Sequence, residues 1–393
     1  MRPLRLAVVS MEYGFEGGAE KFVWEITERM SCIPGLEVHL LASRWKRVGP
    51  QIVCHKIPLF KINRYSTRLS FCWNAYKMIR RGNFDLVHSH ELIQNSDVVT
   101  FGVPHLFWVR EIQKKRSLSL YNCLINFLEK KTLYSQSLSW ILPNSGRALK
   151  AFAQYYPDLL SKVKVINPGV AFERFNGDLK DKELRRKRIL DRFGWDREDL
   201  VGIFVGNNWK LKGLLQVCYG LAEAKNRGLR VNLLVVGRGN RDEVSRFLKL
   251  KGIESQVGFT GLITEGIEHY YQAADFFVLL SRFESFGMVV LEAMASALPV
   301  ILSPDVGAWD VAEEGVNALK IENPEDPKVL AAAFGKLAQP ELRKQLSDNA
   351  LQTAKKNGWQ KALKETLKVY GAVLEKKKLL EKLKRQPYFL DLI

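Results

Sequence analysis

The chain has 393 residues, 47% of them hydrophobic and 26% charged, and it has no low-complexity segment, so a globular protein with two domains is expected and a disordered one is excluded. Five scattered cysteines exclude a disulfide framework and indicate a reducing compartment. No apolar run approaches the ~20 residues of a membrane span, and residues 4–10 read better as a first strand than as a signal peptide. A cytoplasmic protein is expected.

The net charge is +18. Residues 1–170 hold 24 Lys and Arg against 12 Asp and Glu (+12), and the remainder holds 36 against 30 (+6). Two segments, 61–83 and 108–131, mix basic with aromatic residues. Such surfaces attract polyanions, either nucleic acid or an anionic membrane face, and the alternative is an ordinary solvated helix face.

Short apolar runs alternate with helical patterns along the chain, as in βαβ units with a parallel sheet. In the first half the expected strands are 4–10, 37–42, 51–57, 84–89, 104–109, 137–143 and 162–166. The motif at 167–175 interrupts this regular alternation, and a charged stretch then leads into a second series.

The second series repeats the plan, and three helical stretches end the chain. Its expected strands are 200–206, 230–237, 256–261, 275–281, 298–303 and 317–321. This predicts two Rossmann-like lobes, in which ligands bind at the carboxyl ends of the strands and therefore between the lobes.

Gly17 and Gly18 follow the first strand and open a helix. The first amides of a helix are unpaired and favour anions, and glycine lets a phosphate approach the main chain. The spacing is not that of a dinucleotide fingerprint. A plain turn is the alternative.

His88 and His90 end the strand at 84–89. The sequence offers no further ligands for a zinc site beside them, so each is either a structural histidine or a polar contact for a substrate. His90, nearer the loop, is the better candidate for the substrate contact.

Lys210 and Lys212 lie at a helix start after the strand 200–206 and its terminal glycine. A lysine there is unfavourable for the helix dipole, so its presence calls for an anion, and phosphate is the natural one. Lys212 is the stronger candidate, since Lys210 fits a solvated position as well.

Glu284 lies in a loop, and Glu292 lies about one and a half turns into the apolar helix 287–297. A carboxylate in an apolar helix needs a partner. A glycosidase acid/base pair would place the two carboxylates at one level. A ligand with hydroxyls at both ends and phosphates between them fits the spacing better, and the alternative is a Glu292 paired inside the core.

The segment "ESFGMVVLE" with "AMASALPVILSPDVGAWDVAEEGVNAL" closely resembles the E-x₇-E region of retaining GT-B glycosyltransferases of the family-four type. The likeness continues, in the family's order, through "EGGAEKF", "DLVHSHE", "NPGVAFERF", "FVGNNWKLKG", "LLVVGRG" and "VGFTGLI". It spans residues 4–360. It implies an N-terminal acceptor-binding domain (1–170, completed by a terminal helix at 361–393) and a C-terminal nucleotide-sugar-binding domain (171–360), facing across a cleft.

The resemblance also implies roles for residues of the C-terminal lobe, which would hold a nucleotide-diphosphate sugar. Glu292 would bind the ribose diol, and Glu284 would bind the hydroxyls of the donor sugar. Leu262 would lie near the base. Main-chain contacts to the sugar or phosphate would come from Phe286, Gly287 and Met288.

By the same resemblance, Lys212 and Arg174 would neutralise the diphosphate while Gly17 and Gly18 approach it from the other lobe. His90 would lie near the reacting sugar and the acceptor. The expected reacting centre is therefore His90, Arg174, Lys212 and Glu284. A phosphate oxygen would take the acceptor proton, and no side chain is assigned as a nucleophile.

Asn207 stands where many members of the family have an arginine that touches the diphosphate. Asn207 supplies no charge, so Lys212 and Arg174 would carry more of it. A similar replacement is familiar from the lipopolysaccharide-core glucosyltransferase I group, whose members have basic surfaces for membrane attachment.

The expected activity is that of a metal-independent hexosyltransferase with no permanently bound cofactor. A UDP-sugar is favoured over a GDP- or ADP-sugar, and the acceptor would be an anionic glycan or glycolipid in cell-envelope or lipopolysaccharide synthesis. We expect a monomer, peripheral on the cytoplasmic face of the inner membrane, with no nucleic-acid partner. The alternatives are an isomerase similar to UDP-sugar 2-epimerases and a non-catalytic polyanion-binding or membrane-binding relative.

Overall fold

The structure, a computed structural model, describes residues 2–15, 17–176 and 181–377. These form two compact units. Unit 1 comprises the described residues up to Pro168 together with those from Trp359 onward, and unit 2 comprises Gly169–Gly358. The sequence analysis expects boundaries after residues 170 and 360. Each lies two residues beyond the corresponding boundary in the structure, after Pro168 and after Gly358.

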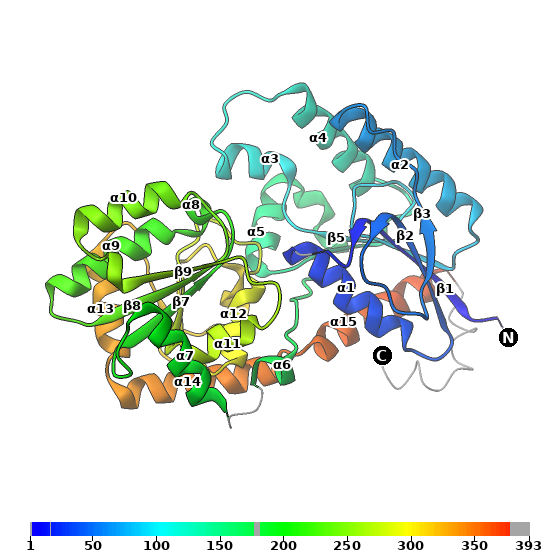
Figure 1. The fold of residues 1–393 in the computed structure, drawn as a ribbon. Coiled ribbons are helices and arrows are strands. Elements are labelled where there is room, and N and C mark those ends of the chain that lie inside the picture. The colour runs from blue at the N-terminus through cyan, green and yellow to red at the C-terminus, as the bar shows by residue number, and fades with distance from the viewer. Residues whose placement is uncertain (1, 16, 177–180, 378–393) are drawn as a thin grey trace. The chain divides into compact units, whose positions relative to one another are not determined.

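Unit 1 is built on a six-stranded sheet of order β3-β2-β1-β4-β5-β6, in which every pair of neighbours is parallel (Figure 1). Its strands are β1 (Leu4–Tyr13), β2 (Leu36–Trp45), β3 (Val53–Lys56), β4 (Leu86–Ser89), β5 (Val98–Phe101) and β6 (Trp140–Pro143). Its helices are α1 (Gly18–Ser31), α2 (Arg64–Arg81), α3 (His105–Phe107), a π-helix (Trp108–Ile112), α4 (Leu120–Leu133), α5 (Gly146–Tyr155), a 3₁₀-helix (Pro157–Lys162) and α15 (Trp359–Lys376).

Unit 2 repeats the plan with a parallel sheet of order β12-β11-β10-β7-β8-β9. Its strands are β7 (Leu200–Val205), β8 (Val231–Val236), β9 (Val257–Gly261), β10 (Phe276–Leu279), β11 (Val300–Leu302) and β12 (Ala318–Lys320). Its longer helices are α7 (Lys182–Phe193), α9 (Leu214–Asn226), α10 (Arg241–Lys251), α11 (Ile267–Ala273), α12 (Met288–Ala295), α13 (Pro327–Leu337) and α14 (Pro340–Lys356). Shorter turns are α6 (Phe172–Asn176), α8 (Trp209–Lys212) and the 3₁₀-helices Glu254–Gln256 and Gly307–Asp310.

The apolar runs of the central strands explain this layering. Every residue of β7 and β8 is buried, so helices must cover both faces of the sheet. The order in unit 2 reverses between β7 and β10, which is the topological switch point of a doubly wound sheet. The expected fold class, two Rossmann-like parallel-sheet domains, is confirmed.

Two expected strands are not formed. Residues 104–109 form helix α3 and the start of the π-helix, because Pro104 begins the turn and the buried carboxylate of Glu129 accepts the His105 backbone N–H at 2.8 Å. The strand in that part of the sheet is β5, which the prediction omitted. The expected strand at 162–166 is reduced to a single bridge between Ile141 and Val163.

Helix α15 comes from the far end of the chain but belongs to unit 1, as the fold class implies for the returning terminal helix. In Figure 1 it lies beside α1, and it also contacts β4. The hydroxyl of Tyr370 lies 2.7 Å from Nδ1 of His88, and Thr100 lies 2.9 Å from its Nε2. The rest of the expected terminal helix, from residue 378, lies outside the described residues.

Substituting Tyr370→Phe should lower the free energy of unfolding by about 1–3 kcal/mol, because His88 is buried and would lose the partner of one ring nitrogen. Urea titration followed by circular dichroism measures this. The matched control is Tyr219→Phe, whose ring is 43% exposed and whose substitution should change the stability little. Equal effects of the two substitutions would contradict a structural role for the His88–Tyr370 contact.

Candidate functional site

The candidate residues of unit 2 gather at the carboxyl edge of its sheet. Asn207 follows β7, Leu262 follows β9, and Glu284 lies between β10 and α12. Carboxyl ends of parallel strands share one edge, so residues distant in sequence meet there.

Lys212 and Glu284, from α8 and the β10–α12 loop, form an ion pair. Both side chains are largely buried. The lysine stem passes over Gly206, where a Cβ would lie 2.4 Å from Lys212 Cδ, so glycine at 206 makes room for this path. The backbone of Glu284 is fixed on either side, since its N–H donates to Asp305 O at 3.0 Å and its carbonyl accepts from Gly307 N at 2.9 Å.

Gly287 is the N-cap of α12 and has a φ of +92°, a conformation that favours glycine. A Cβ there would lie 3.0 Å from Glu284 Cγ. No side chain caps this helix start, which lies next to Glu284 of the Lys212–Glu284 pair. The side chain of Phe286 is buried, so only its main chain could touch a ligand, while Met288 is half-buried.

Glu292 lies one turn further into α12 and is 7% exposed. The buried Tyr271 hydroxyl donates a hydrogen bond to its Oε2 at 3.1 Å. Burial, and then the neighbouring Glu292 carboxylate, raise the pKa of Tyr271 well above its usual value, and Arg174 opposes them. Tyr271 is therefore a neutral donor that holds the carboxylate in place.

Arg174, in α6, is held by a residue that the sequence did not single out. Its Nε and Nη2 donate to one carboxylate oxygen of Glu268 at 3.1 and 3.0 Å. The Arg174 side chain is nevertheless 44% exposed, so a ligand can reach it.

Leu262 and Asn207 both follow strands at this edge, but only the Asn207 side chain makes a hydrogen bond that fixes its direction. Leu262 is half-buried directly after β9. The side chain of Asn207 turns toward the next loop, where its Oδ1 accepts the backbone N–H of Arg238 at 2.9 Å.

In unit 1, His88 and His90 lie side by side with ring centroids 4.3 Å apart. His88 has partners on both ring nitrogens, and burial, together with the neighbouring His90, lowers its pKa well below 6.5. Of the two alternatives, a structural histidine or a substrate contact, His88 is the structural histidine. His90 is half-buried, and its Nδ1 has no hydrogen-bond partner within the described part of the chain. Burial lowers the pKa of His90 to about 3, so the ring is neutral at physiological pH.

Gly17 precedes α1 without any side-chain cap. Phe22 of the same helix packs edge-on against His90, with 6.2 Å between ring centroids, so the two candidates share one edge of the unit 1 sheet. A Cβ at Gly17 would lie 2.1 Å from Glu20 Oε2. The Glu20 carboxylate thus lies over Gly17, and an anion could approach Gly17 and Gly18 only if Glu20 turned away.

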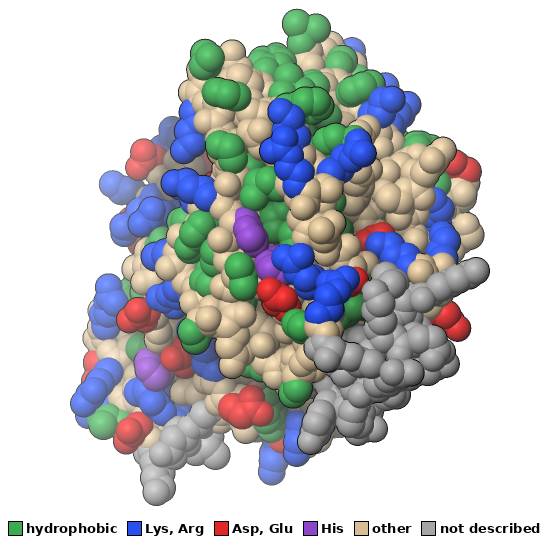
Figure 2. Space-filling model, turned by 90° about the vertical axis from the view of Figure 1, so that its right-hand side faces the viewer, with side chains coloured by type: hydrophobic (Ala, Val, Ile, Leu, Met, Phe, Trp, Pro, Cys, Tyr) green, Lys and Arg blue, Asp and Glu red, His purple; other side chains and the backbone are tan. Residues whose placement is uncertain are grey.

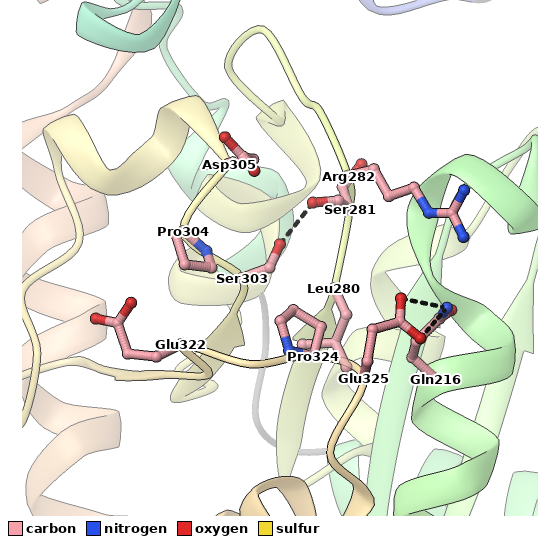
Figure 3. Close-up of a pocket in the computed structure, with 10 residues that line it drawn as sticks. All are labelled: Gln216, Leu280, Ser281, Arg282, Ser303, Pro304, Asp305, Glu322, Pro324 and Glu325. Atoms are coloured by element: carbon pink, nitrogen blue, oxygen red, sulfur yellow. Dashed lines mark hydrogen bonds between the residues drawn. The ribbon is translucent and has the colours of Figure 1, made fainter. Parts of the chain in front are cut away.

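A cavity of about 210 Å³ opens at the same sheet edge of unit 2 but does not coincide with the Lys212–Glu284 site (Figure 3). Figure 3 shows Gln216 donating to Glu325, at 3.0 and 3.3 Å, and Ser303 donating to the Ser281 carbonyl at 2.7 Å. Asp305 and Glu322 also line it. Arg282 lines it as well, but against the three carboxylates of Asp305, Glu322 and Glu325 the lining is acidic overall and does not suit a diphosphate.

Within 2–15, 17–176 and 181–377, no group of three or more His, Cys, Asp or Glu is placed to hold a metal ion. None of the helices in these ranges has both the length and the apolar character needed to cross a membrane.

Each unit matches a known protein family. Residues 16–174 match the family described as Glycosyltransferase Family 4, and residues 199–339 match the family described as Glycosyl transferases group 1. A D-inositol 3-phosphate glycosyltransferase of Streptomyces coelicolor is 24% identical, over 95% of this chain and 93% of its own.

Solved structures agree on the fold. WaaG, a glycosyltransferase involved in lipopolysaccharide biosynthesis, superposes with a TM-score of 0.77 and 17% identity, over 92% of this chain and 98% of its own. HepE of Anabaena in complex with UDP-glucose superposes with a TM-score of 0.71 and 16% identity, over 94% of this chain and 100% of its own. At these identities the likeness shows the fold alone.

The lowered pKa of His90 predicts a stability that falls in acid. Its pKa is about 3 in the folded protein and near 6.5 in the unfolded chain, so only the unfolded chain gains a proton as the pH falls below 6.5. The free energy of unfolding should therefore be lower at pH 5 than at pH 7.5. In His90→Gln the decrease should be smaller, although His88 still contributes. Urea titrations at both pH values measure it, and an identical decrease in both proteins would contradict the prediction.

Proposed function

This chain belongs to the GT-B glycosyltransferases of the family-four type, and we propose that it transfers a hexose from a nucleotide-diphosphate sugar to a glycan or glycolipid acceptor, with retention of configuration. The observation that carries the proposal is the Lys212–Glu284 ion pair beside the uncapped start of α12. It combines a cation, a carboxylate and a helix start without a side-chain cap at one edge of the sheet. Those are the groups that a sugar diphosphate needs.

The two charged residues neutralise each other in the unliganded protein. On donor binding, Lys212 would turn to the diphosphate and Glu284 to the sugar hydroxyls, with Arg174 adding positive charge. The amides of Phe286, Gly287 and Met288 would contact the region between them.

The nucleoside end would be held further along the site. Glu292, aligned by Tyr271, would accept hydrogen bonds from the ribose diol, and Leu262 would pack near the base. HepE binds UDP-glucose, which supports a UDP-sugar as the first donor to test.

The reaction would depend on stabilising charge on the leaving diphosphate. Lys212 and Arg174 supply this stabilisation together with the α12 amides. A phosphate oxygen takes the acceptor proton. Neutral His90 offers a polar contact for the sugar or the acceptor, since its low pKa keeps it uncharged.

Replacing Glu284 or Lys212 by Ala should lower kcat/KM for the nucleotide sugar about 100-fold or more, since each removes a charged contact to the donor. The measurement is sugar transfer from a panel of UDP-, GDP- and ADP-sugars, after melting curves show that the variants fold. The controls Lys249→Ala and Glu254→Ala, both exposed in unit 2, should retain wild-type activity.

Full activity in either site variant would overturn the assignment. Incubation with UDP-sugar alone distinguishes an isomerase from a glycosyltransferase, because an isomerase would form a new UDP-sugar without an acceptor. A protein that binds none of the nucleotide sugars would be the non-catalytic relative.

We also propose that unit 1 attaches to an anionic membrane surface. The surface concerned, here called the α2–α4 face, combines exposed apolar side chains with a basic rim. Its apolar members are Phe60, Ile62, Leu69, Trp73, Leu120 and Phe127. Its basic members are Lys61, Arg64, Lys77, Arg80, Arg81, Lys114, Lys115, Arg116, Lys130 and Lys131.

Aromatic contacts join the two helices of this face. Tyr65 of α2 and Tyr121 of α4 meet edge to face at 5.4 Å, and the Arg64 guanidinium lies 4.4 Å from the Tyr121 ring. Figure 2 shows hydrophobic side chains gathered at the top of one face of the molecule, with Lys and Arg side chains beside them. Apolar residues within a cationic rim suit the boundary between lipid headgroups and acyl chains. The lipopolysaccharide role of WaaG supports an acceptor at such a surface.

A variant with Ile62→Glu and Trp73→Glu should lose most of its binding to vesicles of phosphatidylcholine with phosphatidylglycerol, because it places charge on side chains that are 86% and 58% exposed. Co-sedimentation measures the bound fraction. The matched control is Leu250→Glu, at a 79% exposed position between Lys249 and Lys251 in unit 2, which should bind as the wild type does. Equal binding to neutral vesicles, or to a DNA duplex in place of lipid, would contradict the proposal.

A further inference from the structure

The positive charge at the carboxyl edge of unit 2 is partly offset already. Lys212, the expected phosphate ligand, is the last residue of α8 and is paired with Glu284. Arg174 is likewise paired with Glu268. A diphosphate carries more than one negative charge, so an uncommitted cation at this edge would strengthen its binding.

We infer that Arg238, in the β8–α10 loop, is such a cation and a further binding residue for the donor diphosphate, and that Asn207 acts as its positioning residue. The inference rests on the proposed function. It also gives a reason for the asparagine at a position where an arginine is otherwise expected.

The first support is the direction of the Asn207 side chain. Its Oδ1 accepts the backbone N–H of Arg238 at 2.9 Å. The strands that carry the two residues are neighbours in the sheet, with Val205 paired to Val236. The amide of Asn207 therefore fixes the loop that carries the arginine.

The glycines on either side of Arg238 are fixed as well. Gly237 has a φ of +122°, and a Cβ there would lie 2.3 Å from the Gly206 carbonyl. A Cβ at Gly239 would lie 2.3 Å from the Trp209 ring. The backbone around residue 238 thus packs directly against the segment that leads from β7 into α8 and to Lys212.

The side chain of Arg238, by contrast, is exposed, and it makes no hydrogen bond or ion pair with any other residue that the structure describes. A positioned backbone with an uncommitted guanidinium is a suitable arrangement for binding phosphate, because the planar fork of arginine can hold two phosphate oxygens. Arg241 nearby differs, since its guanidinium lies 5.0 Å from the Phe259 ring centroid.

The test measures nucleotide binding to the full chain by calorimetry. Wild-type protein is titrated with UDP, GDP and ADP, and then with the monophosphate and the nucleoside of whichever base binds best. In Arg238→Gln, the Kd for the diphosphate should rise about tenfold or more, and the Kd for the nucleoside should stay unchanged. Arg246→Gln, another exposed arginine in α10, is the matched control and should stay within twofold of wild type.

Asn207→Ala should also weaken diphosphate binding. The double variant should bind no more weakly than Arg238→Gln alone, because Asn207 acts through Arg238. Additive losses would show that Asn207 meets the ligand itself and would overturn its positioning role. Melting curves without ligand separate loss of folding from loss of binding.

The remaining outcomes are also distinguishable. If wild-type protein binds none of the three diphosphates, the proposed function fails. If it binds one and Arg238→Gln binds it equally well, only the inference on Arg238 fails. An equal loss for nucleoside and diphosphate would place the contact at the base and would overturn the diphosphate assignment.

Discussion

The contact between Lys212 and Glu284 ties the end of α8 to the β10–α12 loop, although the two residues are 72 positions apart in the chain. A salt bridge at the carboxyl edge of the sheet restrains both side chains, but it also neutralises both charges. The parallel sheet makes the contact geometrically natural, since β7 and β10 are neighbours and their loops leave from the same edge. Gly206 leaves room for the lysine in this position, because a Cβ there would lie 2.4 Å from Lys212 Cδ.

A second set of contacts explains how an apolar helix can carry a carboxylate. Glu292 is buried, yet it has a hydrogen-bond donor in Tyr271, whose own pKa is raised so that it stays protonated. A buried group with a partner costs far less than an isolated one. Arg174 is likewise held by Glu268, while its side chain stays partly exposed. Asn207 accepts the backbone N–H of Arg238 and leaves the arginine side chain exposed.

Much of this organisation could be predicted from the sequence, because buried parallel strands are continuous apolar runs and the loops that follow them carry the polar residues. The residues that contact the candidate site residues could not be predicted. Tyr271, Glu268 and Arg238 meet their counterparts through tertiary packing, which leaves no periodic signal in the chain. The error at 104–109 has the same origin: its aromatic and β-branched residues suit a strand, but the group that starts the helix is Glu129, which lies 24 residues further on. The spacing of Glu284 and Glu292 needed no such long-range information, since both belong to one loop and the helix that follows it.

The placement of Tyr370 against His88 has a consequence for synthesis of the protein. These residues are 282 positions apart, and the whole of unit 2 is made between them. At translation rates of about 5–20 residues per second, His88 waits roughly 15–60 s for its partner. Unit 2 is continuous in the chain, so it can finish folding first. The N-terminal unit, although it emerges from the ribosome earlier, is the last to be completed.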